Sequence, residues 1–346
     1  AKLRARIGSM LDEAKIDALL RVASLEEFLQ QLKDTPYAHL AETYDRTGDI
    51  QQVEAQLFER EVTLHREVAS LLEGKHERLV LALTRKLEVE NLKGVLRLWF
   101  SNSIKGQNIT YRYGYLYHSV VVDPIDWSRI VNASHWHEVA LALEHTVYAD
   151  VLATLDSDTI AKDGMFALET ALDRSWFKQA RVSASQMPTR DRRILQAVLD
   201  NDADLKNIIN LVRYGWLYRL PSAQLQDLMF EGGRVCGSKE FIDYLASPPE
   251  NRSPITLVRK YYPKLAAKLA EEHESNPVAK QIVQVERYLG TVRRQEHMAM
   301  LRGNPFNIGT ILAYFFLCER QDKMIRAIMN GLYYGWDAQT IRGFAL

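Results

Sequence analysis

The chain has 346 residues, 47% of them apolar, and its 44 Lys and Arg residues balance 44 Asp and Glu residues. This length allows one large domain or two to three smaller ones, and the apolar content excludes wholesale disorder. The balanced charge argues against a nucleic-acid binder, for which an excess of positive charge is typical.

Two cysteines, Cys236 and Cys318, lie in unlike contexts, so the chain has neither a disulfide framework nor a zinc pattern and suits a reducing compartment. The longest apolar run, 308–318, is well short of the ~20 residues that a spanning helix needs. No charged-then-apolar leader opens the sequence, so we expect no secretory signal. If the protein functions at a membrane, we expect it to bind the surface of another component that is already embedded in the membrane.

Helical signals follow one another along the chain. Residues 24–27 read Ser-Leu-Glu-Glu, a capping box at a helix start. Apolar residues keep helical spacing over 53–71, 77–100 and 255–289, whereas the one β-branched run, 119–122, is too short to build a sheet. We therefore predict an all-α protein. A cap-type residue also precedes proline, as at helix starts, in Thr35-Pro36, Asp123-Pro124, Ser253-Pro254 and Asn304-Pro305. Segments rich in Gly, Pro, Ser or Asn predict loops at 101–108, 183–191, 231–238 and 247–253.

An internal repeat gives the architecture. Segment 88–97 recurs at 204–213, 116 residues later, and more faintly at 321–329, a further 117 residues on. Because the shared apolar positions recur at i, i+3 and i+4, they predict one buried helical stripe in each copy. The aligned apolar residues are Leu92, Val95 and Leu96, then Ile208, Leu211 and Val212, then Ile325, Ile328 and Met329.

Polar residues of the repeat lie beside this stripe. An acidic residue precedes Asn by three positions in the first two copies, which places both on one side of the helix. Capping or interhelical hydrogen bonds are the ordinary use of such residues. The pairs are Glu88 with Asn91 and Asp204 with Asn207, and Gln321 with Met324 occupies the same positions in the third copy.

Each copy lies about 25 residues before the end of a unit of similar length. The chain accordingly divides into three helical modules, 1–113, 114–229 and 230–346. Such modules stack as an open solenoid or close into a pseudo-threefold ring. A closed ring has a central hollow, which suits an axial partner.

Several stretches carry a family resemblance, and the most specific reads Pro-Phe-Asn-Ile-Gly from residue 305. The others are 5–11, 23–28, 32–37, 90–97 and 228–234, and the most specific stretch continues through Ala313, Tyr314 and Glu319 to Ile325 and Arg326. Over essentially its whole length the chain resembles the C subunit of the archaeal and bacterial V-type (A-type) ATPases, the counterpart of the d subunit of the eukaryotic vacuolar ATPase. Gln321 and Met324 depart from the acidic residue and the Asn of that family, so the third motif is open to different polar contacts.

The resemblance implies a funnel of three helical subdomains on the cytoplasmic surface of a membrane rotor ring. This funnel would receive the central shaft, made of the D and F subunits, and pass on rotation driven by ATP hydrolysis or ion flow. A protein of this kind is peripheral to the membrane, adheres and transmits torque without catalysis, and needs no cofactor or metal. Aromatic and arginine residues are the usual anchors of modest polar interfaces. The interface candidates, which could equally serve helix packing, are Arg97, Tyr113, Tyr115, Arg213, Trp216, Arg326, Tyr334 and Trp336.

Two other classes of function are alternatives. An enzyme or metal site would use the histidine cluster of His135, His137 and His145 with Glu138, but no H-E-x-x-H, G-x-S-x-G or P-loop motif is present. The second alternative is a helical repeat scaffold or RNA-binding protein unrelated to rotary ATPases. An RNA-binding repeat protein would show a basic face and salt-dependent binding to polyanions, whereas this chain is neutral overall.

Overall fold

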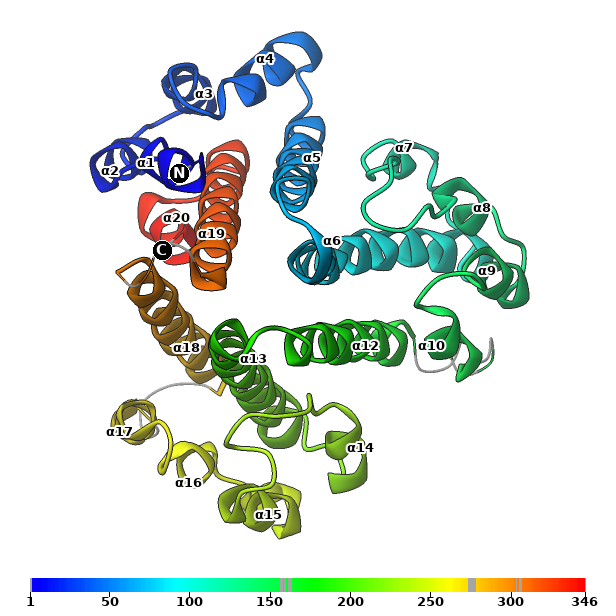
Figure 1. Ribbon diagram of the computed structural model, residues 1–346, viewed down its shortest axis with the longest axis vertical. Coiled ribbons are helices and arrows are strands. Elements are labelled where there is room, and N and C mark those ends of the chain that lie inside the picture. Colours follow the sequence, from blue (N-terminus) through cyan, green and yellow to red (C-terminus); the bar gives the residue numbers. More distant parts are fainter. Residues whose placement is uncertain are drawn as a thin grey trace. The chain divides into compact units, whose positions relative to one another are not determined.

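The computed structural model describes residues 2–155, 158, 160, 164–272, 278–302, 304 and 307–345, and all regular structure in these residues is helical (Figure 1). The all-α prediction is thus confirmed. None of the described helices is both long and apolar enough to cross a bilayer. Pro305 and Phe306, at the start of the most specific stretch of the resemblance, lie outside the described residues.

The chain forms two compact units. Unit 1 combines residues 1–176 with residues 311–346, and unit 2 comprises Phe177–Thr310. The two divisions fall inside helices α12 (Phe166–Ser185) and α19 (Ile308–Tyr333).

The first part of unit 1 packs short helices against a long one. Figure 1 shows α1, α2 and the C-terminal helix α20 beside α19, next to both labelled termini. The core beneath them combines Phe28, Leu32 and Leu40 with Ile325 and Ile328 of α19, all of them essentially inaccessible to solvent. The helices are α1 (Lys2–Gly8), α2 (Glu13–Leu19), α3 (Leu25–Leu32), α4 (Ala38–Thr47), α5 (Ile50–Ala69), α19 and α20 (Ala338–Ala345).

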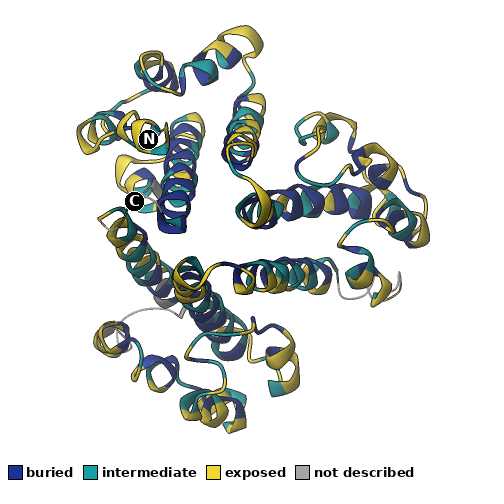
Figure 2. Cartoon of the chain, viewed as in Figure 1, coloured by how far each residue is buried: buried dark blue, intermediate teal, exposed yellow. Residues whose placement is uncertain are grey.

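The second part of unit 1 is built on α6 (Gly74–Trp99), which has a long buried face (Figure 2). Trp99 is completely buried and donates its indole N–H to the carbonyl of Ala133 at 3.0 Å. Ser103 Oγ donates to the same carbonyl at 2.8 Å. The other elements are η1 (Phe100–Ile104), α7 (Thr110–Tyr113), α8 (Trp127–Val131), α9 (Trp136–Ala142), α10 (Ala149–Ala153) and the first half of α12.

Unit 2 repeats this construction on α13 (Thr189–Asn210). Its core gathers Ile208, Leu211 and Val212 with Leu225 and Leu257, which are all completely buried. The other elements are η2 (Leu211–Leu217), α14 (Ser222–Asp227), α15 (Lys239–Ala246), η3 (Pro249–Asn251), α16 (Pro254–Val258), α17 (Pro263–Glu272) and α18 (Val278–Leu301).

The buried stripe is confirmed in all three copies, because each of the nine aligned apolar residues is at most 1% exposed. Two loop predictions were too long. Segment 101–108 begins as the π-helical turn η1, which the bonds to Ala133 stabilise, and in 183–191 only residues 186–188 lie outside α12 and α13. There Pro188 directly precedes the first turn of α13, where its fixed φ suits a helix start.

Candidate interaction surface

A buried carboxylate of α6 anchors the helices that follow it. Glu88 is completely buried and accepts the hydroxyl proton of Tyr148 at 2.8 Å. Its other oxygen accepts the backbone N–H groups of Val122 and Asp123 at 2.8 and 2.7 Å. Burial raises the pKa of Glu88, and burial beside Glu88 raises the pKa of Tyr148 far above its usual value. One side chain therefore holds both the loop before α8 and the start of α10.

Asp204 plays the same part on α13. This completely buried carboxylate accepts the backbone N–H groups of Arg234 and Val235, each at 2.8 Å, and the hydroxyl of Tyr262 at 3.4 Å. The loop comes this close because Gly233 has no side chain. Its φ of +80° favours glycine, and a Cβ there would lie 2.3 Å from Asp204 Oδ1.

On α19 the buried acid is Asp322. It accepts the Tyr37 hydroxyl at 2.7 Å, and the Arg60 guanidinium lies 2.9 Å away and over the Tyr37 ring. Tyr37, Tyr148 and Tyr262 each directly precede a short helix, so the same contact occurs three times.

An amide accompanies each acid. Asn91 donates to the carbonyl of Tyr117 and accepts its N–H at 2.9 and 3.2 Å, and Asn207 holds Phe230 in the same way at 3.0 and 2.8 Å. In α19 this bidentate contact belongs to Gln321, which donates to Leu11 O at 2.8 Å and accepts from Leu11 N at 3.4 Å. The third motif therefore makes the contacts of the first two with different residues, and Met324 is a core residue.

Two of the predicted arginines hold neighbouring helices within their own units. Arg97 forms a bidentate pair with Glu169 of α12 at 2.7 and 2.5 Å. Arg213 pairs with Glu286 of α18.

The third arginine belongs to a similar contact between α19 and α5. Arg326 lies 3.9 Å from Glu54 of α5, whose carboxylate also accepts from Asn330 at 2.6 Å.

Three pairs of elements thus carry the same kind of contact: α6 with α12, η2 with α18, and α19 with α5.

Three of the predicted aromatic residues have intramolecular partners. The Tyr113 ring packs edge-on against His118 at 4.5 Å between centroids, and the Tyr115 hydroxyl donates to Asp49 at 2.8 Å. Trp216 packs against the core of unit 2.

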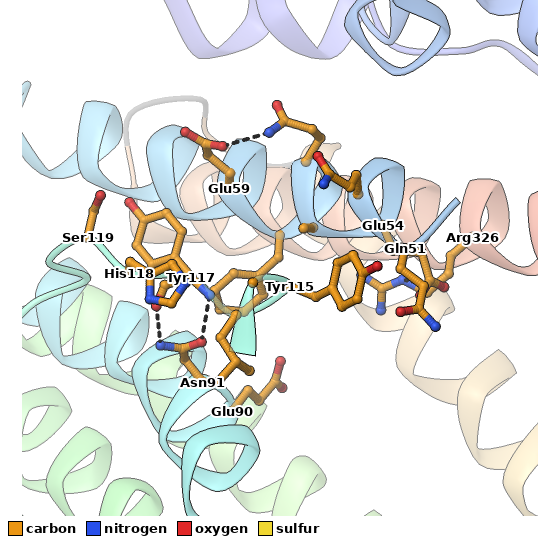
Figure 3. Close-up of a pocket in the computed structure, with 16 residues that line it drawn as sticks. Gln51, Glu54, Glu59, Glu90, Asn91, Tyr115, Tyr117, His118, Ser119 and Arg326 are labelled. Atoms are coloured by element: carbon orange, nitrogen blue, oxygen red, sulfur yellow. Dashed lines mark hydrogen bonds and ion pairs between the residues drawn. The ribbon is translucent and has the colours of Figure 1, made fainter. Parts of the chain in front are cut away.

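Tyr115 and Arg326 line an open cleft of about 570 Å³ in unit 1 (Figure 3). Gln51, Glu54 and Glu59 of α5 line one side, and Glu90 and Asn91 of α6 with segment 114–119 line the other (Figure 3). Its lining mixes amides, carboxylates and phenol rings with apolar side chains such as Phe58 and Leu116. Asn91 and Tyr115 are already engaged in the fold.

Tyr334 and Trp336 lie in a different setting, at an exposed corner between α19 and α20. We call Tyr333, Tyr334, Trp336 and Phe344 the C-terminal aromatic cluster. Neighbouring rings along this series have centroids 5.0, 6.4 and 5.4 Å apart. The side chains nevertheless face solvent, with Tyr334 60%, Trp336 41% and Phe344 70% exposed.

The local sequence determines this corner. Gly335, at φ +70°, ends α19 with bonds from its own N–H to Leu332 O at 3.3 Å and from Trp336 N to Gly331 O at 2.7 Å. This pattern is a Schellman motif, in which a left-handed glycine closes the helix. Asp337 then caps α20 by accepting the N–H of Thr340 at 2.9 Å.

Gly331 lets α20 pack directly on α19, because a Cβ at this position would lie 2.4 Å from the Ile341 side chain. The aromatic rings are thereby presented by two helices in close contact, each with a defined end.

The histidine region contains no metal-binding group among the residues that the structure describes. His135 directly precedes α9, and His145 is a 92% exposed side chain beside Glu144. Across the described part of the chain, no three His, Cys, Asp or Glu side chains converge as metal ligands.

The three tyrosines and Asp322 were not among the residues predicted from the sequence. A signal was available for two of the tyrosines: Thr35-Pro-Tyr37 and Thr146-Val-Tyr148 share a threonine two residues before the tyrosine. In each, the threonine hydroxyl donates to a carbonyl three residues back at 2.7 Å and accepts the tyrosine N–H at 3.2 Å.

Comparison with known proteins gives one consistent match. Residues 1–344 match the family described as ATP synthase (C/AC39) subunit. Similar curated proteins are the A-type ATP synthase C subunits of Methanosphaera stadtmanae, with 24% identity over 95% of this chain and 81% of that protein, and of Methanocaldococcus jannaschii, with 22% identity over 100% and 85%. The corresponding protein of Haloferax volcanii is 23% identical over 99% of this chain and 94% of its own length.

Proposed function

Because the chain belongs to the ATP synthase (C/AC39) subunit family, we propose that it is the non-catalytic central-stalk subunit of a rotary A-type or V-type ATPase. In this proposal it is a socket that couples the shaft of the D and F subunits to the membrane rotor ring. It lies on the cytoplasmic face and reaches the membrane only through the ring. The observation that carries the proposal is the match of residues 1–344 to one family, together with relatives named as A-type ATP synthase C subunits.

We further propose that the modules 1–113, 114–229 and 230–346 form a funnel with pseudo-threefold symmetry. The support is a contact that recurs three times, each time between one module and the next in cyclic order: a buried acid of one module binds a tyrosine before a short helix of the next. An amide beside each acid binds the backbone of that next module as well. A socket that transmits torque needs helices whose mutual positions are fixed. In each unit an ion pair adds a polar contact between neighbouring elements: Arg97 joins α6 to α12, and Arg213 joins η2, which directly follows α13, to α18.

The C-terminal aromatic cluster is the proposed anchor for one of the two partners. Exposed Tyr and Trp side chains on a rigid corner are typical of interface hot spots, and this cluster needs no rearrangement before it binds. Of the eight sequence candidates, Tyr334 and Trp336 are the two whose rings are more than 40% exposed and stack on one another.

The test is co-elution of the purified chain with the D–F shaft and, separately, with the detergent-solubilised ring. We expect binding to both. The double variant Tyr334→Ser with Trp336→Ser should weaken one of them by about 30-fold or more, the effect of losing about 2 kcal/mol at a hot spot. The matched control is Ile242→Ser, which replaces another exposed apolar side chain outside the cluster.

Binding to neither partner by a folded protein would exclude the socket. Unchanged affinity of the double variant for both partners would instead remove the aromatic cluster from the interface and leave the socket standing.

A further inference from the structure

The end of η2 in unit 2 exposes an apolar, an aromatic and a charged side chain in succession. Leu217 is 37% exposed and Tyr218 is 62% exposed, and Arg219 also faces solvent. We call these three residues the η2 tip. The Tyr218 ring stacks on the ring of Tyr214 with 5.9 Å between centroids, so it has a packed position although most of it is exposed.

The backbone of the tip is strained. Arg219 has a φ of +55°, and in the described part of the chain it is the one residue other than glycine with a positive φ. A residue with a Cβ adopts this left-handed conformation at a cost in free energy, which is smaller for Asn. Such strain persists where the surrounding structure fixes the backbone, and it is concentrated at functional sites. The conformation therefore suggests a use for the arginine side chain itself.

A buried arginine fixes this turn. Arg252 is 3% exposed, and its Nη1 donates to the carbonyl of Leu220 at 2.5 Å and to that of Gly215 at 3.4 Å. These two carbonyls lie on either side of the tip in the sequence. The N–H of Leu220 also donates to the carbonyl of Tyr214 at 2.9 Å. The tip is thus held in one conformation before any partner binds, which lowers the entropic cost of binding.

Neither Arg219 nor Arg252 is paired with an acid in the described part of the chain. Arg219 has no hydrogen bond or ion pair there. Arg252 contacts carbonyl and hydroxyl oxygens and the face of a tyrosine ring, all of them neutral, and its buried Nε has no hydrogen-bond partner. Residues 205–226 contain no Asp or Glu, and Glu250, the acid nearest to Arg252 in the sequence, is exposed to solvent. The unneutralised positive charge favours a carboxylate at the tip.

The internal repeat relates the tip to the C-terminal aromatic cluster. By the offset of 117 residues between the second and third copies, Leu217 corresponds to Tyr334 and Arg219 to Trp336. Each of these two copies therefore has exposed side chains where its long helical segment ends. The second copy has a cation where the third has an indole, so it selects for a negatively charged partner.

We propose that the η2 tip is a docking point for an acidic segment of a protein partner. A carboxylate of this segment pairs with Arg219, and its apolar side chains pack on Leu217 and Tyr218. Exposed Tyr and Arg side chains on a fixed backbone are typical of interface hot spots. The inference rests on the proposed function, because the partners to be tested are the D–F shaft and the rotor ring.

A series of charges at residue 219 tests this contact. Arg219→Lys keeps the cation, Arg219→Asn removes it with a residue that tolerates the left-handed conformation, and Arg219→Glu reverses it. The affinity of the full chain for the D–F shaft and for the detergent-solubilised ring is measured at low and at physiological salt. For one of the two partners we expect Arg219→Asn to weaken binding by about tenfold at low salt, Arg219→Glu to weaken it more and Arg219→Lys to weaken it least. The loss should shrink at higher salt, because salt screens the ion pair in the unmodified complex.

Urea denaturation of the same variants separates binding from folding. Because Asn is less strained than Arg at a positive φ, Arg219→Asn should raise the urea midpoint while it weakens binding. A residue retained only for the fold would show a lowered midpoint and unchanged binding. The matched control is Arg190→Asn, which replaces an exposed arginine in the first turn of α13 and should leave the affinity unchanged.

Unchanged affinity of Arg219→Asn for both partners, or an equal loss in Arg190→Asn, would overturn the docking point and leave the socket standing. Co-sedimentation with vesicles of anionic lipid that depends on Arg219, together with unchanged affinity for both proteins, would overturn it in favour of a membrane contact. Failure of the folded, unmodified chain to bind either partner would exclude the socket and this docking point with it.

Discussion

Replacement of Tyr148 by Phe tests whether the tyrosine–carboxylate contact stabilises unit 1. The substitution removes one oxygen and leaves a ring that is 1% exposed in its packed position. Glu88 then keeps its two backbone donors, Val122 and Asp123, and loses the donor to its other oxygen.

The magnitude follows from what the orphaned oxygen loses. Glu88 is completely buried, so water cannot replace the lost donor without opening the structure. Leaving one buried acceptor unsatisfied costs about 1–3 kcal/mol. Unit 1 contains about 210 residues. For a unit of this size, each kcal/mol corresponds to a decrease in melting temperature of about 2–4 °C.

Urea denaturation followed by circular dichroism gives the free energy of unfolding, and it should be measured at pH 5 and pH 8.5. The Tyr148 hydroxyl opposes the rise in the pKa of Glu88 that burial causes, so Tyr148→Phe raises this pKa further. The folded variant then binds its proton at higher pH than the folded unmodified chain does. The cost of the substitution is therefore largest above that pKa and decreases as pH falls.

Two comparisons make this result interpretable. Tyr333→Phe removes a hydroxyl from a half-exposed ring of the same unit, and we expect no measurable change. Tyr262→Phe should cost less than Tyr148→Phe, because its hydrogen bond to Asp204 Oδ2 is long at 3.4 Å and this oxygen also has the Arg234 guanidinium at 3.4 Å. A cost for Tyr148→Phe below about 0.5 kcal/mol, or one that does not depend on pH, would refute the reasoning.

Three further outcomes are expected. Asn207→Ala strips both hydrogen bonds from the backbone of Phe230 and should destabilise unit 2 by about 2–3 kcal/mol in urea denaturation. Gly233→Ala combines φ +80° with a 2.3 Å clash against Asp204, so its cost should exceed about 1 kcal/mol by the same assay. His65, with a lowered pKa of about 3, should make unit 1 less stable as pH falls from 6.5 towards 3, because the unfolded state binds the proton first; thermal melts of His65→Gln should lack this part of the acid dependence.

The buried stripe of the repeat was predictable because it depends on local periodicity alone. Residues 92, 95 and 96 share one face of any α-helix, and an apolar face in water is buried whatever covers it. The same argument foresaw α5 and α6 to within a few residues. It could not foresee η1, because bonds from Trp99 and Ser103 to a carbonyl about 30 residues away stabilise this turn in a Ser- and Asn-containing segment.

The tyrosine contacts could not be derived from spacing. Tyr148 lies 60 residues from Glu88, and Tyr37 lies 285 residues from Asp322. Tyr37 and Asp322 meet because the N-terminal helices pack against α19 near the other end of the chain. No local sequence pattern predicts this packing. For the same reason the sequence could not show which interface candidates are free to bind a partner. Arg97 and Tyr334 are both residue types that anchor interfaces, yet Arg97 is paired with Glu169 and Tyr334 faces solvent.

The third copy of the motif keeps the contacts of the first two although its residue types differ. In the first two copies the amide follows the acid by three residues, whereas Gln321 precedes Asp322 by one. These two placements differ by four residues, about one helical turn, so the amide stays on the same face of the helix. Gln also reaches one methylene further than Asn, and its partner is again the N–H and C=O of a single residue. In the sequence alignment of the repeat, Gln321 stands at the position of Asp204. The hydrogen bonds show instead that Asp322 is the counterpart of Asp204, since each accepts a tyrosine hydroxyl. Packing therefore requires a carboxylate and an amide on that face of the helix, but not in a fixed order.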